Sequence, residues 1–335
     1  MNMEHKKYPS IENSYREKAL EQIRKYVPSN EKWIVQEKLH GANLQIQTDG
    51  NTVKFGSRNL MLNTFTELEQ FNRLDTIAEN LSFAAIEMYH DLKEMSYLQE
   101  GNDLIIYGEL CGGSYPHEDV PAVDTPMVQK GVFYGPGLYF FAFDVYIKNS
   151  EESGHYLWSD TFDSLIRKYF NHTRILFTGT LDECLQFPND GQTTIPAEFN
   201  LPEIEDNIME GVVIKPVSCA RPRFMLKNKN ERFTEKQQRS KRDKTPQVIS
   251  SNLQEAMDTL GQYINENRLD AVLSKHGQPL EGKVIGQTIG ELTKDALEDM
   301  EKDDSEILQT LEKGERKTLN KYGSSLSRKL ILAKV

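Results

Sequence analysis

Lys38 stands in a setting that suits a covalent nucleophile. Residues 37–43 read EKLHGAN and lie between a strand predicted over 33–36 and a hairpin strand predicted over 43–47. A lysine between a strand end and a glycine turn is held in place, and Gly41 lets a nucleotide approach the backbone closely. A desolvated lysine amine can act as a neutral nucleophile. The same pattern also fits a surface lysine beside a turn, so the other motifs must decide.

Five further segments place charged or aromatic side chains at or near predicted strand ends. In chain order they are SR at 57–58, YGELCG at 107–112, FAFD at 141–144, EGVVIK at 210–215 and LKNK at 226–229. Together with Lys38, their order and spacing resemble those of the covalent nucleotidyltransferases. This superfamily comprises the ATP- and NAD-dependent polynucleotide ligases and the mRNA capping enzymes.

Within that superfamily the chain resembles the RNA ligase 2 family, which includes phage RNA ligase 2 and the kinetoplastid RNA-editing ligases. The nucleophile motif carries His40, where DNA ligases and capping enzymes usually have Asp. The opening YPSIEN at 8–13 and the stretch VQKGVFY at 128–134 also resemble the family. So do three carboxy-terminal segments, NR at 267–268, SKHG at 274–277 and GKVIGQT at 282–288. The resemblance covers almost the entire chain.

The resemblance implies an ATP-dependent RNA ligase that joins a 3′-hydroxyl to a 5′-phosphate at nicks in duplex RNA. AMP passes from ATP to Lys38 and then to the 5′-phosphate, and the 3′-hydroxyl finally displaces it. A free lysine with a pKa of about 10.4 is almost fully protonated at neutral pH, a handicap of about 4 kcal/mol. Nearby cations and a bound metal lower such a pKa. Lys227, Lys229 and Mg²⁺ (or Mn²⁺) are the candidates for lowering the pKa of Lys38.

Roles for the remaining site residues follow from the same resemblance. Lys227 and Lys229 share one face of an extended strand and would contact phosphates. Glu210 would hold the metal through water, because Mg²⁺ keeps much of its hydration shell. His40 and Asn43 would order the loop of the nucleophile, and His40 would also act on a phosphate. The expected nucleotide contacts come from Glu37, Leu39, Asn43, Arg58 (phosphate), Glu109 (ribose), Phe143 (adenine), Lys227 and Lys229.

Alternatives stay open for several of these residues. Phe143 could belong to a plain core stripe with Phe141 and Tyr139, and the two lysines could be solvated on an edge strand. The roles of Asp144 and Lys215 are not defined by the sequence.

The predicted elements give an α+β fold. An antiparallel-sheet nucleotidyltransferase domain, ATP-grasp-like and of ligase type, is followed by a small all-α domain. Helical spacing of apolar residues over 74–92, with Thr76 and Glu79 placed as a capping box, predicts one helix. The predicted strands cover 33–36, 43–47, 53–55, 104–109, 138–145, 211–215 and 223–227, with a turn at Asp49-Gly50 in the first hairpin.

A strongly basic stretch separates the two predicted domains. Residues 221–244 contain ten basic and three acidic side chains, whereas the whole chain has a net charge of −11. The predicted domains are 1–240 for adenylyl transfer, including this basic tail, 241–246 as a linker, and 247–335 as a helical domain that engages the nick. Further helices are expected from Ser251-x-x-Gln254 onward, over 269–274, 289–300 and the final stretch. The resemblance implies that Arg268 and Glu291 contact the RNA ends.

Composition excludes several classes of protein. The three cysteines form no CxxC pair, which argues against a disulfide framework and a zinc site. The absence of a long apolar run argues against a membrane span. We therefore expect a soluble, cytoplasmic, monomeric enzyme without a membrane partner. Residues 277–283 match most of a phosphate-binding Walker loop, but Val284 replaces the Ser or Thr that would hold Mg²⁺.

Other readings share the same nucleotide pocket. A DNA ligase usually carries a β-barrel after the catalytic domain, which the helical tail argues against. An mRNA guanylyltransferase would use GTP. A non-catalytic RNA-binding protein could keep the fold, although every expected catalytic residue is present.

Overall fold

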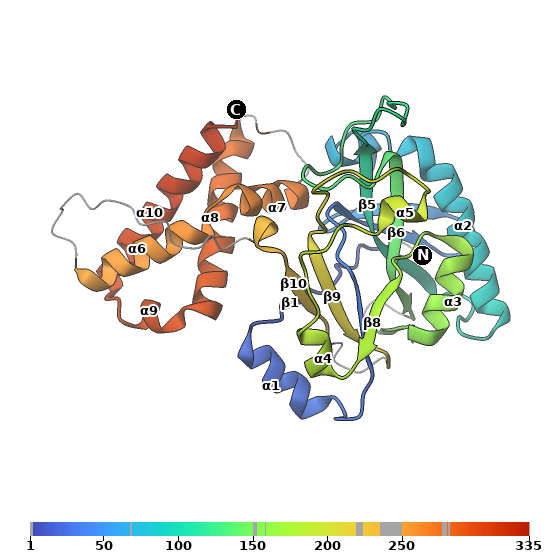
Figure 1. Ribbon diagram of the computed structural model, residues 1–335, viewed down its shortest axis with the longest axis horizontal. Helices are drawn as coiled ribbons and strands as arrows, with labels where there is room; N and C mark the ends of the chain where they lie inside the picture. The colour runs from blue at the N-terminus through green and yellow to red at the C-terminus, as the bar shows by residue number, and fades with distance from the viewer. Residues whose placement is uncertain are drawn as a thin grey trace. The chain divides into compact units, whose positions relative to one another are not determined.

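The computed structural model describes residues 3–67, 69–149, 153–157, 159–218, 224–234, 250–276, 280 and 282–334. The chain divides into two compact units, with the division after Asn230 (Figure 1). Among the described residues, no helix is both long enough and apolar enough to cross a membrane. The predicted linker 241–246 and most of the basic stretch lie outside the described residues.

Two five-stranded sheets form the first unit (Figure 1). The first sheet has the order β1-β10-β9-β2-β8, and all of its pairs are antiparallel except β1 with β10. Its strands are β1 (Glu12–Asn13), β10 (Leu226–Lys229), β9 (Gly211–Pro216), β2 (Trp33–Glu37) and β8 (Ile175–Gly179). Lys38 follows the end of β2 in this sheet and precedes β3 of the second sheet.

The second sheet has the order β4-β3-β5-β6-β7 and is antiparallel throughout. Its strands are β4 (Val53–Ser57), β3 (Ala42–Thr48), β5 (Asp103–Ser114), β6 (Gly135–Lys148) and β7 (Gly154–Tyr156). The predicted hairpin at Asp49-Gly50 joins β3 to β4, and Gly50 has the positive φ of 91° that favours glycine. The α+β fold expected from the sequence is confirmed.

Five α-helices accompany the sheets among the described residues of the first unit: α1 (Glu17–Tyr26), α2 (Asp75–Glu94), α3 (Ser159–Tyr169), α4 (Leu181–Leu185) and α5 (Ile195–Glu198). The apolar stripe of α2, with Ala85, Met88 and Leu92, packs in one core with the alternate side chains of the second sheet. The predicted capping box of α2 is wrong. Leu74 is the N-cap, and Thr76 lies inside the first turn, where its hydroxyl donates to the Arg73 carbonyl.

The described part of the second unit is helical, with α6 (Ser251–Tyr263), α7 (Glu266–His276), α8 (Lys283–Asp303), α9 (Ser305–Gln309) and α10 (Lys313–Leu332). A single-turn 3₁₀ helix, η3 (Glu231–Phe233), precedes them. Leu260, Leu292, Ala296 and Ile331 belong to their common core. The predicted start of α6 is displaced by one residue, because Ser250 is the N-cap and accepts a hydrogen bond from the Leu253 N–H.

Candidate active site

Three neighbouring strands bring Lys38, Glu210 and Lys229 together. Lys38 directly follows β2, and its N–H donates to the Gly211 carbonyl at 2.9 Å, which extends the pairing of β2 with β9. Glu210 immediately precedes β9. On the other side of β9, Lys229 of β10 is the register partner of Gly211. Residues that are 172 and 191 positions from Lys38 along the chain thus meet at one point.

Glu210 binds two of the predicted catalytic lysines. Its Oε2 lies 2.6 Å from Lys38 Nζ, and its Oε1 lies 3.0 Å from Lys229 Nζ. The Glu210 side chain is 3% exposed, whereas Lys38 is 20% exposed. Burial acts to raise the pKa of Glu210, but the charges of Lys38 and Lys229 hold that pKa well below its ordinary value. Glu210 is therefore an anion that fixes both cations.

The loop after Lys38 is held at two backbone positions. The His40 N–H donates to the Tyr134 hydroxyl at 2.7 Å, and the Gly41 N–H donates to Glu109 Oε1 at 3.1 Å. A Cβ on Gly41 would lie 2.1 Å from the Leu110 carbonyl oxygen, so only glycine fits there. These contacts give the loop a defined path, which keeps the Lys38 amine in place.

The His40 imidazole lies between two polar groups. Its Nε2 lies 3.1 Å from the Lys130 carbonyl oxygen, and its Nδ1 lies 3.7 Å from Glu210 Oε2. The ring therefore lies beside the carboxylate that binds Lys38.

Glu109 is partly buried beside this loop and lies opposite Asn43 in the pairing of β3 with β5. Burial raises its pKa from 4.5 to about 7, although the nearby charge of Lys38 acts in the opposite direction. Both protonation states of this carboxyl are therefore populated near neutral pH, so it can donate as well as accept a hydrogen bond.

Glu37 turns its carboxylate away from Lys38 and toward residues 193–194. It accepts hydrogen bonds from the Thr193 hydroxyl at 2.5 Å and from the Thr194 N–H and hydroxyl at 2.8 and 2.9 Å. Burial raises its pKa, and these hydrogen bonds oppose the rise. Leu39 is also buried. The side chains flanking Lys38 thus anchor it from within the protein.

Two predicted nucleotide contacts lie with the amino-terminal segment. The Phe143 ring packs edge-on against Tyr8, with 5.0 Å between the ring centroids, and Arg58 Nη2 donates to the Ser10 hydroxyl at 3.1 Å. Asp144, whose role the sequence left open, accepts a hydrogen bond from the Tyr8 hydroxyl at 2.8 Å. Asp144 thereby fastens the segment that carries Tyr8.

The other lysines of the two motifs differ in burial. Lys227 is partly exposed on β10 and lies on the same face as Lys229, as predicted from the strand period. Lys215, whose role was undefined, is buried in β9 opposite Ile34.

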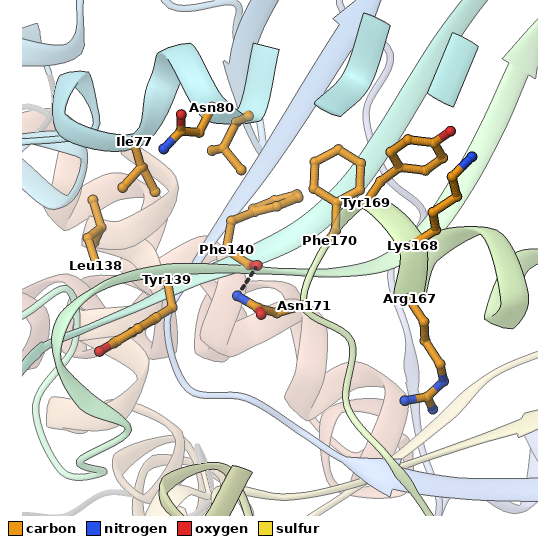
Figure 2. A pocket seen from close by; sticks show the side chains of 11 residues that line it. Ile77, Asn80, Leu138, Tyr139, Phe140, Arg167, Lys168, Tyr169, Phe170 and Asn171 are labelled. Carbon is orange, nitrogen blue, oxygen red and sulfur yellow. Dashed lines mark hydrogen bonds between the residues drawn. The ribbon is translucent and has the colours of Figure 1, made fainter. Parts of the chain in front are cut away.

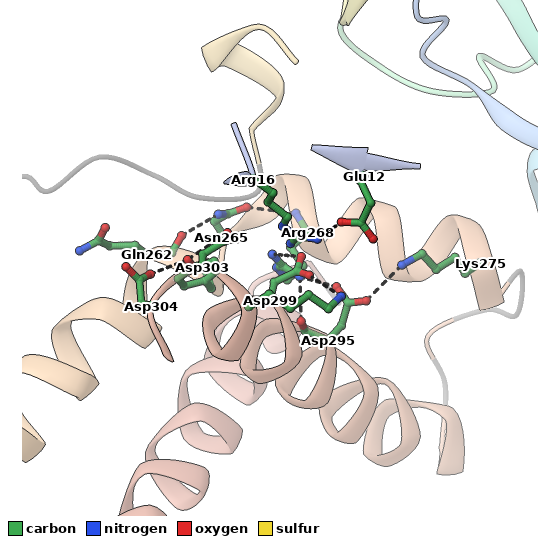
Figure 3. A network of polar contacts seen from close by, with 12 residues as sticks. Glu12, Arg16, Gln262, Asn265, Arg268, Lys275, Asp295, Asp299, Asp303 and Asp304 are labelled. Atoms are coloured by element: carbon green, nitrogen blue, oxygen red, sulfur yellow. Dashed lines mark hydrogen bonds and ion pairs between the residues drawn. The ribbon is translucent and has the colours of Figure 1, made fainter. Parts of the chain in front are cut away.

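The two predicted RNA-end contacts in the helical unit differ in exposure. Arg268 of α7 is only 1% exposed and forms ion pairs with Asp295 and Asp299 of α8, at 3.0 Å for the second (Figure 3). Lys275 adds a further ion pair to Asp295 at 3.2 Å. Glu291 is exposed on α8. The Arg268 guanidinium is therefore engaged in joining α7 to α8.

Sequence reasoning assigned no role to Tyr134 or to the residue that holds its segment. The Asn207 side chain accepts from the Phe133 N–H at 2.9 Å and donates to the Phe133 carbonyl at 2.7 Å. Tyr134 belongs to the VQKGVFY stretch that carried part of the family resemblance, so this stretch could have identified Tyr134 as a site residue. Asn207 had none, because it lies 74 residues from Phe133.

A separate pocket lies between α2, the end of α3 and β6 (Figure 2). Phe140 and Phe170 form part of its lining, and none of the predicted site residues does. Two of the lining cations are already paired, Arg167 with Asp163 and Lys168 with Asp91. This pocket is therefore separate from the predicted nucleotide site.

Comparison with known proteins identifies the class to which this site belongs. The RNA ligase family matches residues 31–229, and the family described as T4 RNA ligase 2 C-terminal matches residues 246–328. The chain belongs to the RNA ligase family, and the carboxy-terminal match confirms the RNA ligase 2 type expected from the sequence.

Particular relatives agree with this assignment. The mitochondrial RNA-editing ligase 1 of Trypanosoma brucei brucei is 29% identical over 357 residues, covering 88% of this chain and 75% of that protein. Mitochondrial RNA-editing ligase 2 of the same organism is 25% identical over 380 residues, covering 97% of this chain and 90% of that protein. The expected enzyme class, an RNA ligase, is thereby confirmed.

Solved structures of Naegleria gruberi RNA ligase are also similar to this chain. An apo form has a TM-score of 0.45 and 18% identity, and a form with ATP and Mn has a TM-score of 0.42 and 17% identity. The apo match covers 68% of this chain, and both matches span 56% of the Naegleria chain.

Proposed function

We propose that this protein is an ATP-dependent RNA ligase in which Lys38 is the adenylyl-accepting nucleophile. The Lys38 nitrogen attacks the α-phosphorus of ATP, an N–P bond forms, and the bond to the β-phosphate oxygen breaks to release pyrophosphate. AMP then passes to an RNA 5′-phosphate, and the 3′-hydroxyl displaces AMP to form the phosphodiester. The observation that carries this proposal is the buried, ionised Glu210 bridging Lys38 and Lys229.

The surrounding residues suit the parts of the nucleotide. Lys227 and Lys229 share a strand face, so both cations can approach the phosphates, where negative charge develops during transfer. Glu109 would bind the ribose hydroxyls, because a carboxyl group with a pKa of about 7 can exchange hydrogen bonds with them in either protonation state. Asn43 lies opposite it. Arg58 as phosphate clamp and Phe143 as adenine platform complete the proposed contacts.

Glu210 fits a hydrated Mg²⁺ or Mn²⁺. Among the described residues, no group of three or more His, Cys, Asp or Glu side chains could hold a metal by itself. Mg²⁺ is commonly bound by one or two carboxylates, substrate phosphates and several waters, and Glu210 supplies one ionised carboxylate. The metal would neutralise phosphate charge when bound. The Naegleria ligase forms that contain ATP and Mn agree with this choice of cofactors.

We propose nicked double-stranded RNA as the substrate and a division of labour between the domains. Residues 1–240 would transfer the adenylyl group, residues 241–246 would link the domains, and residues 247–335 would engage the nick through Arg268 and Glu291. Duplex RNA is read mainly by its shape and 2′-hydroxyls. We also propose that the protein is a monomer and that it acts in the cytoplasm. Light scattering and cell fractionation test these two points, and recovery in an organelle would correct the second.

The test uses radiolabelled ATP and GTP with magnesium. Wild-type protein should become labelled by ATP alone, whereas Lys38→Ala should not, and Lys54→Ala, a lysine on β4, should behave as wild type. Labelled wild type should seal a nicked RNA duplex. Labelling by GTP would indicate a guanylyltransferase, preferential sealing of DNA would indicate a DNA ligase, and no labelling at all would indicate a non-catalytic RNA-binding protein.

A further inference from the structure

Helix α10 exposes a row of cations. Lys313, Lys317, Lys321, Arg328 and Lys329 are all exposed on this helix. None of them has a carboxylate within 4.0 Å among the described residues, in contrast to Lys294 and Lys302 of α8, which are paired with Glu298 and Asp299. We call these five side chains of α10 the basic strip.

The spacing of the basic strip places its centre on one face. Lys317, Lys321, Ser324 and Arg328 follow one another at intervals of four, three and four residues, which is the repeat of a single helix face. At 1.5 Å per residue, the distance from Lys313 to Lys329 is about 24 Å. The strip is therefore long enough to contact several successive phosphates.

Packing of the other face of α10 leaves the basic strip directed outward. Leu319, Gly323, Ser327 and Ile331 are buried. A Cβ on Gly323 would lie 3.0 Å from side-chain atoms of Leu260 and Thr293, so α10 packs closely at this point. The apolar face of α10 is thus used inside the helical unit, and the basic face remains for an external ligand.

Charge is distributed unevenly between α10 and the rest of the helical unit. Residues 313–332 contain six basic and one acidic side chain, whereas residues 250–312 contain five basic and fourteen acidic ones. Such a gathering of uncompensated cations in an acidic chain is a local electrostatic footprint for a polyanion.

We propose that the basic strip of α10 binds the sugar–phosphate backbone of duplex RNA. The choice of duplex RNA as the ligand rests on the proposed function. The basic strip is the surface that would bind this RNA. Lysine and arginine side chains contact phosphates without reading bases, so the strip positions the duplex rather than selecting a sequence. A membrane surface fits less well, because an interfacial helix needs a free apolar face, and that of α10 is packed.

The experiment measures binding of the full-length protein to a nicked RNA duplex by fluorescence anisotropy at several salt concentrations. The test variant combines Lys317→Gln, Lys321→Gln and Arg328→Gln. The control combines Lys283→Gln, Lys294→Gln and Lys302→Gln on α8, which removes the same charge from the same unit. Circular dichroism and self-adenylylation with labelled ATP are measured on each preparation.

Each phosphate contact contributes about 0.7–0.9 to the slope of log affinity against log salt. The α10 variant should lower that slope by about 2 and weaken binding at least tenfold at low salt, with unchanged helicity and unchanged self-adenylylation. The α8 control should keep the wild-type slope. An α10 variant with the wild-type slope would overturn the inference, as would a wild type that binds anionic vesicles or an acidic peptide but not RNA. Loss of wild-type self-adenylylation would instead count against the proposed function.

Discussion

Two buried ion-pair networks, one in each unit, have opposite charge arrangements. In the first unit the carboxylate of Glu210 lies between the amines of Lys38 and Lys229. In the second unit the guanidinium of Arg268 lies between the carboxylates of Asp295 and Asp299. Each network is organised around a central group that is almost fully buried.

The networks differ in what they leave available for chemistry. Lys38 is 20% exposed at the end of a strand, so a substrate can reach its amine once the nucleotide displaces the ion pair. Arg268 is enclosed, and Asp295 and Asp299, with which it forms ion pairs, both belong to α8. Within the proposed function, the first network holds a nucleophile that a nucleotide can reach, whereas the second network joins α7 to α8.

The largest effect is expected at the centre of the first network. Glu210→Gln removes the charge that holds Lys38 and Lys229, and loss of a preorganised charge typically costs about 10²–10³ in rate. Single-turnover labelling with ATP measures this rate. The exposed Glu205→Gln is the matched control and should label as wild type. Equal rates for both variants would show that the Glu210 network is merely structural.

Glu109 makes the stability of the first unit depend on pH. Its folded pKa is raised from 4.5 to about 7, so the stability that its protonation contributes is full below pH 4.5 and is lost as pH rises to about 7. This displacement corresponds to about 3 kcal/mol. Relative to Glu109→Gln, which does not titrate, the wild type should lose about that much free energy of unfolding across this window. Denaturant titrations at half-unit pH steps measure the free energy of unfolding of both proteins. Parallel curves of this free energy against pH would contradict the prediction.

Arg268 tests the second network. Arg268→Met should reduce the stability of the helical unit by about 2 kcal/mol, below the usual cost of breaking a buried pair because Asp295 and Asp299 remain partly exposed. Labelling of Lys38 should persist. Limited proteolysis of the helical unit measures the change, with Arg268→Lys as the charge-preserving control. Poor sealing without any loss of stability would instead support the contact to an RNA end expected from the sequence.

Tyr134 should give the smallest effect. Tyr134→Phe deletes the hydroxyl that accepts from the His40 N–H, at a cost of about 1 kcal/mol, or about fivefold in the labelling rate. The control Tyr115→Phe removes a hydroxyl that donates to the Pro202 carbonyl, away from the nucleophile loop. If both variants label equally fast, the Tyr134 contact does not position Lys38.

The strands and the lysine motifs could be predicted because their signals are local. The apolar runs gave the cores of β2, β3, β5, β6 and β9, and the strand period placed Lys227 and Lys229 on one face. Helix starts were not predicted to the residue: Thr76 and Ser251 have capping residue types, but Leu74 and Ser250 occupy the N-cap positions.

The contacts between distant segments could not be read from the sequence. Glu210 meets Lys38 only because β9 pairs with β2 in one register, and Tyr134 reaches His40 across 94 residues. A register irregularity between Tyr107 and Gly108 changes which β6 side chains oppose β5, so Phe141 rather than Ala142 lies opposite Glu109. Arg268 had the expected residue type, but its burial depends on tertiary packing.

The most direct measurement is the position of the adenylyl group. After incubation with ATP and magnesium, peptide mass spectrometry should find one AMP on Lys38 in the wild type and none anywhere in Lys38→Ala. An adduct on Lys227, Lys229 or any other side chain, or no adduct in an intact wild-type protein, would contradict the assignment of Lys38 as the nucleophile.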